Sequence, residues 1–313
     1  MINRCRRAPF LASYQDLSIY LCDCADWAPS RQELVAAARF SARDVDDPPA
    51  LFVADPFLAL AGDRTYLFFE LMPRNTLRGV IGVAHSRDRR HWTYGGVVLR
   101  EPFHLSFPNV FRRGDDWFMV PECAEQGEVR LYRAVSFPTE WTFERTLLEG
   151  RFADSVLWEH DGTWFMASSP RMETLRLFVA PDPLGPWTEH PRSPIVEGDL
   201  SAARPAGPPI PCDGVTVRLA QDCRGTYGRA VGAFRIESIS AEAYSERPCG
   251  QGPVLGPGAA LAPQAQGMHH LHAQRAGAGR WIVACDAWRM RRTWARRVLL
   301  PAIDGSRPNR SHA

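Results

Sequence analysis

The chain has 313 residues, 45% of them hydrophobic and 11% aromatic, which suits one large packed domain and excludes a disordered protein. Its 37 lysine-plus-arginine residues against 35 acidic residues give a net charge of +2, so charge gives no reason to expect nucleic-acid binding. All 37 are arginines, and enzymes that need a Schiff-base or P-loop lysine are therefore excluded.

The N-terminal segment predicts neither a signal peptide nor a membrane span. It begins with Arg4, Arg6 and Arg7 and contains no long apolar run, and no transmembrane segment is expected anywhere in the chain. The eight cysteines are scattered without a C-x-x-C pair, so we expect a cytoplasmic protein with reduced thiols.

Residues 1–50 form a separate N-terminal segment before the regular part of the chain. The segment 31–40 follows a Pro29-Ser30 cap signal and predicts a short helix. Part of 10–28 is expected to complete the last unit of the fold, because a closed sheet arrangement removes exposed strand edges.

From residue 51 the sequence repeats a strand–turn–strand pattern. Residues 55–70 contain two aromatic-rich runs joined by Gly62-Asp63, and related patterns span 107–122, 154–169, 204–221 and 269–286. The starts of these repeats are 52, 47, 50 and 65 residues apart. Five strand-rich repeats near this period predict an all-β, five-bladed β-propeller over residues 51–290.

One tryptophan follows the outer turn in each of the first three repeats: Trp92, Trp141 and Trp187. Stacking on a sugar would be the functional interpretation. Because a binding residue would not recur at the same place in every blade, we instead predict a structural clasp between the outer strands.

The C-terminal segment 291–313 is rich in arginine. One interpretation is a basic amphipathic helix, continuing from Arg289, that contacts an acidic partner or a lipid surface. The other, which we favour, is a solvated closing segment.

Polar residues that differ from blade to blade occupy equivalent positions in the aligned repeats. The starts of the first strands carry Asp55, Phe107, Asp154, Arg204 and His269, and the ends of the second strands carry Glu70, Glu122, Ser169, Gln221 and Asp286. Since inner strands of a propeller converge on its channel, these groups are expected to meet at one mouth. So many buried polar groups require a ligand or one another as partners.

The carboxylates of this ring suit glycoside chemistry. Of Asp55, Asp154 and Glu122, one can act as base or nucleophile, one can protonate the leaving oxygen, and one can tune its neighbour's pKa. Arg204 could clamp a sugar hydroxyl, a carboxylate or a phosphate. The wider set of predicted substrate-binding residues is Glu70, Gln221, Asp222, His104, His269 and His270.

His104 lies in a different repeat from His269, His270 and His272, and the four lack helix spacing or a Cys/His pattern, so we predict no metal site. No nucleotide-binding or hydrolase-triad motif is present, and no cofactor is expected.

Several motifs resemble the N-terminal domain of glucosamine inositolphosphorylceramide transferase, over roughly residues 50–290. They include Ala54-Asp55-Pro56-Phe57-Leu58, His104-Leu105-Ser106-Phe107-Pro108, Pro121-Glu122, Ala203-Arg204-Pro205-Ala206-Gly207, Gln221-Asp222-Cys223 and Tyr227-Gly228. That domain is similar in turn to the five-bladed propellers of family 43 glycoside hydrolases. The resemblance implies a general base at Asp55 and a pKa-tuning aspartate at Asp154.

At one position this chain differs from the pattern of family 43 hydrolases. Family 43 hydrolases usually take their general acid from the fourth blade, where this chain has Arg204, so Glu122 would have to serve. Two functions stay open: an enzyme that hydrolyses or transfers a glycosyl group, and a non-catalytic propeller that binds a glycan or a sugar nucleotide. A carbohydrate or sugar nucleotide is the expected partner in both.

Overall fold

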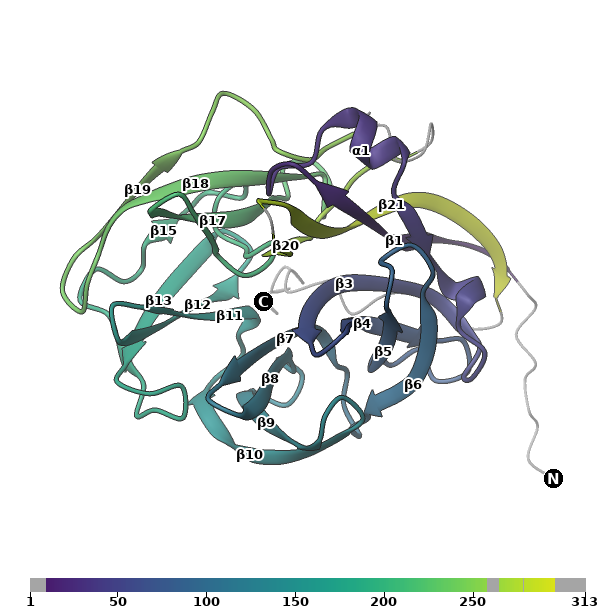
Figure 1. Cartoon of the computed structure of the whole chain (residues 1–313), viewed down its shortest axis with the longest axis horizontal. Coiled ribbons are helices and arrows are strands. Elements are labelled where there is room, and N and C mark those ends of the chain that lie inside the picture. The colour runs from purple at the N-terminus through teal and green to yellow at the C-terminus, as the bar shows by residue number, and fades with distance from the viewer. Residues whose placement is uncertain (1–9, 258–264, 278, 296–313) are drawn as a thin grey trace, which may run out of the picture.

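In the computed structural model, residues 10–257, 265–277 and 279–295 are described, and they form five antiparallel sheets arranged around a central axis (Figure 1). The predicted five-bladed β-propeller is confirmed. Among the described residues, no helix has the length and apolar character needed to cross a bilayer.

The first three blades follow one another along the chain, each with its first strand innermost. Blade one contains β3 (Ala50–Ala61), β4 (Arg64–Pro73), β5 (Val80–Ser86) and β6 (Thr93–Leu99). Blade two contains β7 (Ser106–Arg113), β8 (Asp116–Glu122), β9 (Glu128–Ser136) and β10 (Glu140–Glu149). Blade three contains β11 (Ala153–His160), β12 (Thr163–Arg171), β13 (Thr174–Ala180) and β14 (Thr188–Glu189), and β15 (Val196–Glu197) also pairs with β13.

Blade four has a broken inner strand. It contains β16 (Ile210–Cys212), β17 (Val215–Asp222), β18 (Ala230–Ile239) and β19 (Tyr244–Pro248). Where an inner strand was expected from Pro205, only an isolated bridge to Ala220 forms before β16. The prolines at 205, 208 and 209 explain this, because proline cannot donate a ladder hydrogen bond.

Blade five joins both ends of the described chain. Its strands are β20 (Leu271–Arg275), β21 (Trp281–Ala295), β1 (Phe10–Cys24) and β2 (Ala38–Phe40), in that order from the inside. β1 and β21 pair along their full 15 residues, from Phe10 opposite Ala295 to Cys24 opposite Trp281. This N-terminal strand therefore closes the ring of blades without leaving β21 as an edge.

One expected element is shorter in the structure, and the less favoured interpretation of the Arg-rich segment is wrong up to Ala295. The helix predicted over 31–40 is only α1 (Arg31–Val35), capped by Ser30, and it is followed by β2 and by the short 3-10 helix η1 (Ala42–Asp44). The Arg-rich segment is strand up to Ala295 and not an amphipathic helix, since β1 supplies hydrogen-bond partners throughout this length. Residues 296–313 lie outside the described part of the chain.

The three repeated tryptophans have the predicted structural role. Each indole N–H donates to a carbonyl of its own outer turn: Trp92 to Arg89, Trp141 to Pro138 and Trp187 to Pro183. All three pack against hydrophobic core clusters. They close the turns before the fourth strands and are not sugar platforms.

Candidate functional site

Three inner strands share one local distortion at the equivalent position of each repeat. Asp55 on β3, Phe107 on β7 and Asp154 on β11 have φ of 51°, 45° and 52°, and strand pairing shifts register across each of them. A β-bulge re-aims a side chain, and left-handed φ is costly for a residue such as phenylalanine. The sequence alignment of the repeats therefore placed structurally equivalent residues together.

Carboxylates from neighbouring blades hold two of these bulges, those at Asp55 and Phe107. The Asp55 amide donates to Oδ2 of Asp286 at 3.1 Å, and the Phe107 amide donates to Oδ2 of Asp55 at 3.2 Å. The amides of His269 and His270 donate to Oδ1 of Asp286 at 3.1 and 3.0 Å. The carboxylates thus link blade five to blade one and blade one to blade two, which fixes Asp55 at the junction.

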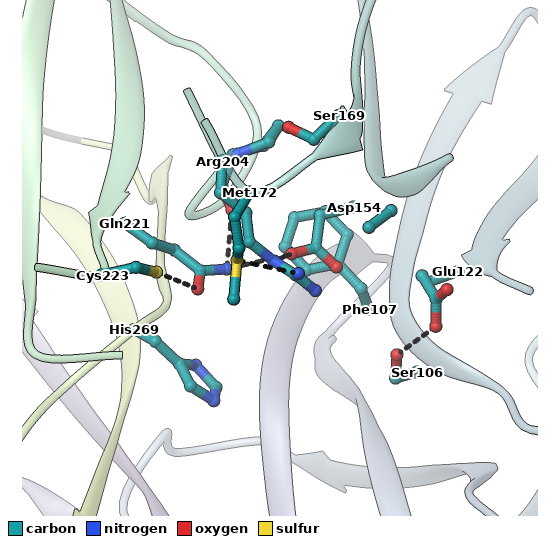
Figure 2. Close-up of polar contacts among 12 residues, drawn as sticks. Ser106, Phe107, Glu122, Asp154, Ser169, Met172, Arg204, Gln221, Cys223 and His269 are labelled. Atoms are coloured by element: carbon teal, nitrogen blue, oxygen red, sulfur yellow. Dashed lines mark hydrogen bonds and ion pairs between the residues drawn. The ribbon is translucent and has the colours of Figure 1, made fainter. Parts of the chain in front are cut away.

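Arg204 of blade four reaches across to blade three. Its Nε donates to Oδ2 of Asp154 at 2.6 Å, and Nε2 of Gln221 donates to the same oxygen at 3.0 Å (Figure 2). The Tyr227 ring lies 5.2 Å from the guanidinium carbon, in cation–π contact. Asp154 is 2% exposed, so this group is a buried ion pair with an amide as additional donor.

Glu122 lies apart from the Arg204 group in the close-up, beside Ser106 (Figure 2). The Ser106 hydroxyl donates to Oε2 at 3.0 Å and the Ala124 amide donates to Oε1 at 2.9 Å. Both donors are neutral, so they orient the carboxylate without neutralising it.

Glu70 is paired with His104. Its Oε1 lies 3.4 Å from Nε2 of the ring, and the Gly79 amide donates to Nδ1 at 3.0 Å. With Nδ1 acting as acceptor, the ring carries its proton on Nε2 and presents it to Glu70.

Burial raises the pKa values of three acids in the ring. It raises the pKa of Asp55 to about 7, with Asp154 and Asp286 adding to the shift and His269 opposing it. Burial also raises the pKa of Glu122, helped by the Asp154 charge. The pKa of Glu70 lies well above its ordinary value because of burial and the neighbouring carboxylates. Such shifts are expected where several acids converge in one desolvated place.

The two adjacent histidines differ in protonation: His269 is protonated and His270 is neutral. Burial favours the neutral ring of His269, but Asp286, whose Oδ2 lies 2.8 Å from Nδ1, raises its pKa to about 9. Burial lowers the pKa of His270 to about 3. His270 packs edge-on against Phe57 and Phe107, so it is a neutral core ring below the ionised pair.

The structure brings most of the sequence-predicted site residues together. Asp55, Glu70, Glu122, Asp154, Arg204, Gln221, His104 and His269 lie in this one cluster. Asp222, in contrast, is paired with Arg224 and Arg229 at 2.9 and 3.0 Å, beside the group. It caps its own loop because β17 ends there.

Two members of the cluster were absent from the predicted site set. Asp286 lies at the aligned end of the second strand in the fifth repeat, and this position could have assigned it to the site. Tyr227 comes from a loop between β17 and β18 and has no positional signal in the repeat.

A cation could be held only by Asp55, His269 and Asp286, whose potential ligand atoms lie within 4.8 Å of one another among the described residues. Asp286 raises the pKa of His269, so a cation bound by this histidine would have to displace the ring proton.

Residues 20–287 match the family described as glucosamine inositolphosphorylceramide transferase 1, N-terminal. The chain belongs to this family. It is 39% identical over 251 residues to glucosamine inositolphosphorylceramide transferase 1 of Oryza sativa subsp. japonica, covering 77% of this chain and 34% of that relative. It therefore spans about a third of the length of this curated relative.

Solved structures of carbohydrate-active propellers share the fold. The catalytic domain of a family 62 α-L-arabinofuranosidase from Coprinopsis cinerea superposes with a TM-score of 0.56 at 11% identity, covering 77% of this chain and 92% of that chain. An α-L-arabinanase from Cellvibrio cellulosa gives 0.54 at 15% identity, covering 77% and 91%. At these identities the similarity shows the fold alone, and with the family assignment it supports a carbohydrate-related protein.

Proposed function

We propose that this protein hydrolyses or transfers a glycosyl group in glycan or glycolipid metabolism. The observation that carries the proposal is that Asp55 and Glu122, from adjacent blades, both have raised pKa values and that the charge of Asp154 contributes to each shift. The names of the relatives, a glycosyl-group transferase and several glycoside hydrolases, favour the same chemistry.

The residues divide into roles by their environments. Asp55, with a pKa of about 7, can take a proton near neutral pH and acts as the general base. Glu122, whose raised pKa favours the protonated acid, acts as the proton donor to the leaving oxygen. Asp154 is held by Arg204 and Gln221 and supplies a fixed negative charge that raises the pKa of both neighbours.

A non-catalytic glycan- or sugar-nucleotide-binding propeller is the second candidate, and the Arg204–Asp154 ion pair favours it. Arg204 lies at the blade-four position and forms an ion pair with Asp154, which leaves fewer acids for proton transfer. Arg204 and Gln221 would then serve as hydrogen-bond donors to a bound sugar.

The deciding experiment measures chemistry and binding separately. The purified chain would be incubated with a panel of nitrophenyl glycosides, oligosaccharides and sugar nucleotides, and products and binding would be followed by NMR. Turnover that is lost in Asp55→Asn, with binding retained, supports the enzyme. Saturable binding without turnover by the unmodified protein supports the binding propeller instead.

A further inference from the structure

A polar cavity of about 420 Å³ lies outside the carboxylate cluster and is lined mainly by arginines. Its guanidiniums come from β2, η1, the residue after β4, and β21: Arg39, Arg43, Arg74, Arg289, Arg291 and Arg292. We call this the arginine pocket. Within the described part of the chain, its lining contains one carboxylate, Asp16 of β1. The chain as a whole balances 37 basic against 35 acidic residues, so this excess is local.

Several of the arginines are oriented by contacts within the protein. Arg74 donates from Nε to the Ala50 carbonyl at 2.8 Å, and Arg39 donates to the Ser18 hydroxyl at 2.9 Å. Arg289 and Arg291 share Asp16, with Nε–Oδ2 distances of 3.3 and 3.0 Å. Since a guanidinium has five N–H donors, the contacts of Arg39 and Arg74 fix their direction and leave further donors for a ligand.

Asp44 of η1 is outside the lining of the pocket and caps its own turn. Asp44 accepts from the amide and hydroxyl of Ser41, at 2.8 Å each, and so caps η1. Its carboxylate holds the η1 turn, on which Arg43 lies, in place. Among the described lining residues, six guanidiniums lie around one carboxylate, and an anion in the cavity would reduce their mutual repulsion.

We propose that the arginine pocket binds the phosphoryl groups of a phosphorylated sugar or sugar diphosphate. Guanidiniums match phosphate oxygens bidentately, which makes several arginines around one cavity a phosphate site. The volume is in the range of small-molecule sites and exceeds what one inorganic ion needs. The sugar part of this proposal rests on the proposed function, whereas the phosphate part stands on the pocket alone.

The pocket and the carboxylate cluster lie on the same two strands. Leu51 lines the pocket four residues before Asp55 on β3, and Arg289 lines it three residues after Asp286 on β21. At about 3.3 Å per strand residue, the two sites are roughly 10–13 Å apart along these strands. In Figure 1 the end of β21 runs with β1 to the edge of the molecule near β3.

Calorimetric titration with pyrophosphate and with glucose 1-phosphate, in low-salt chloride buffer, tests the proposal. The test variant is Arg43→Ala/Arg292→Ala, because both residues are exposed and neither belongs to the buried core. The matched control is Arg90→Ala/Arg192→Ala, which removes two exposed arginines elsewhere. We expect both ligands to bind, at least tenfold more weakly to the test variant and equally to the control. Circular dichroism checks that both variants are folded.

Other outcomes are equally informative. No binding of either phosphate compound, or binding unchanged in the test variant, overturns the site. Binding of phosphatidylinositol vesicles but not phosphatidylcholine vesicles, lost in the test variant and without glucose 1-phosphate binding, retains the phosphate site and overturns its sugar ligand. Neither variant alters Asp55 or Arg204, so failure here leaves the proposed function standing, and failure to find turnover leaves phosphate binding standing.

Discussion

Nε of Arg204 lies 2.6 Å from Oδ2 of Asp154, which joins blade four to blade three through a nearly buried ion pair. The side chains are 18% and 3% exposed. Removing one partner of such a pair leaves an uncompensated buried charge, which typically costs about 3–5 kcal/mol, although the intact pair adds much less to stability.

Arg204→Ala should therefore lower the free energy of unfolding by about 3 kcal/mol or more. Arg204→Ala/Asp154→Ala should be less destabilised than the sum of its single variants, because no charge is then stranded. Urea unfolding measures all three. Arg87→Ala, which breaks the exposed pair with Asp63, is the control and should change stability by less than about 1 kcal/mol. Additive single effects would show that the buried pair is not coupled.

Asp55→Asn tests the general base. The amide retains the shape of the side chain and its oxygen can still accept from the Phe107 amide, but it cannot take a proton. Once a substrate is found, kcat should fall at least about 100-fold while sugar binding changes little. Asp115→Asn, at an exposed turn, is the control. Unchanged turnover in Asp55→Asn would mean that Asp55 only links the blades.

The pH–rate profile gives a second test of the same residue. A base with a pKa of about 7 should make kcat/KM rise with pH through an inflection near pH 7. The charged His269 lowers the pKa of Asp55, so His269→Gln should move the inflection to higher pH. A rate that falls through pH 7 would instead assign Asp55 the role of acid.

Much of this arrangement could be predicted from the sequence. The spacing of the strand–turn–strand repeats predicted five blades, and polar residues at equivalent positions predicted which side chains meet. Asp55, Phe107 and Asp154 prove equivalent even in their left-handed φ. Their backbone conformation itself was not predictable, because residue type does not mark a phenylalanine for positive φ.

The rest depends on tertiary contacts that leave no local pattern. Tyr227 reaches Arg204 from an irregular loop. The arginine pocket combines side chains from β1, from β2 and η1, from blade one and from β21, and it forms where β1 closes blade five beside β3. Even the strand character of the C-terminal arginines follows from pairing with a segment more than 250 residues earlier.

The His269–Asp286 ion pair predicts how stability depends on pH. His269 has a folded pKa of about 9, above its unfolded value of about 6.5, so its contribution is fully present below about pH 6.5 and lost as pH rises through 9. The difference in unfolding free energy between the unmodified protein and His269→Gln should therefore shrink by about 3 kcal/mol between pH 6 and pH 10. Urea unfolding at several pH values measures it. A difference that does not change with pH would mean that the folded ring is neutral.

Gly207→Ala tests whether blade four must approach blade five closely to place Arg204. Gly207 has φ of 138°, and a Cβ there would lie 2.0 Å from the Leu271 carbonyl oxygen, so β20 and the Arg204 segment would have to separate. The matched control is Gly214→Ala, whose φ is 80° and whose Cβ would meet nothing within 4 Å. We expect the control to lose about 1 kcal/mol through backbone strain alone and Gly207→Ala to lose clearly more. Sugar binding should weaken only in Gly207→Ala, because Arg204 would be displaced, and equal losses in both variants would show that the close contact does not position this residue.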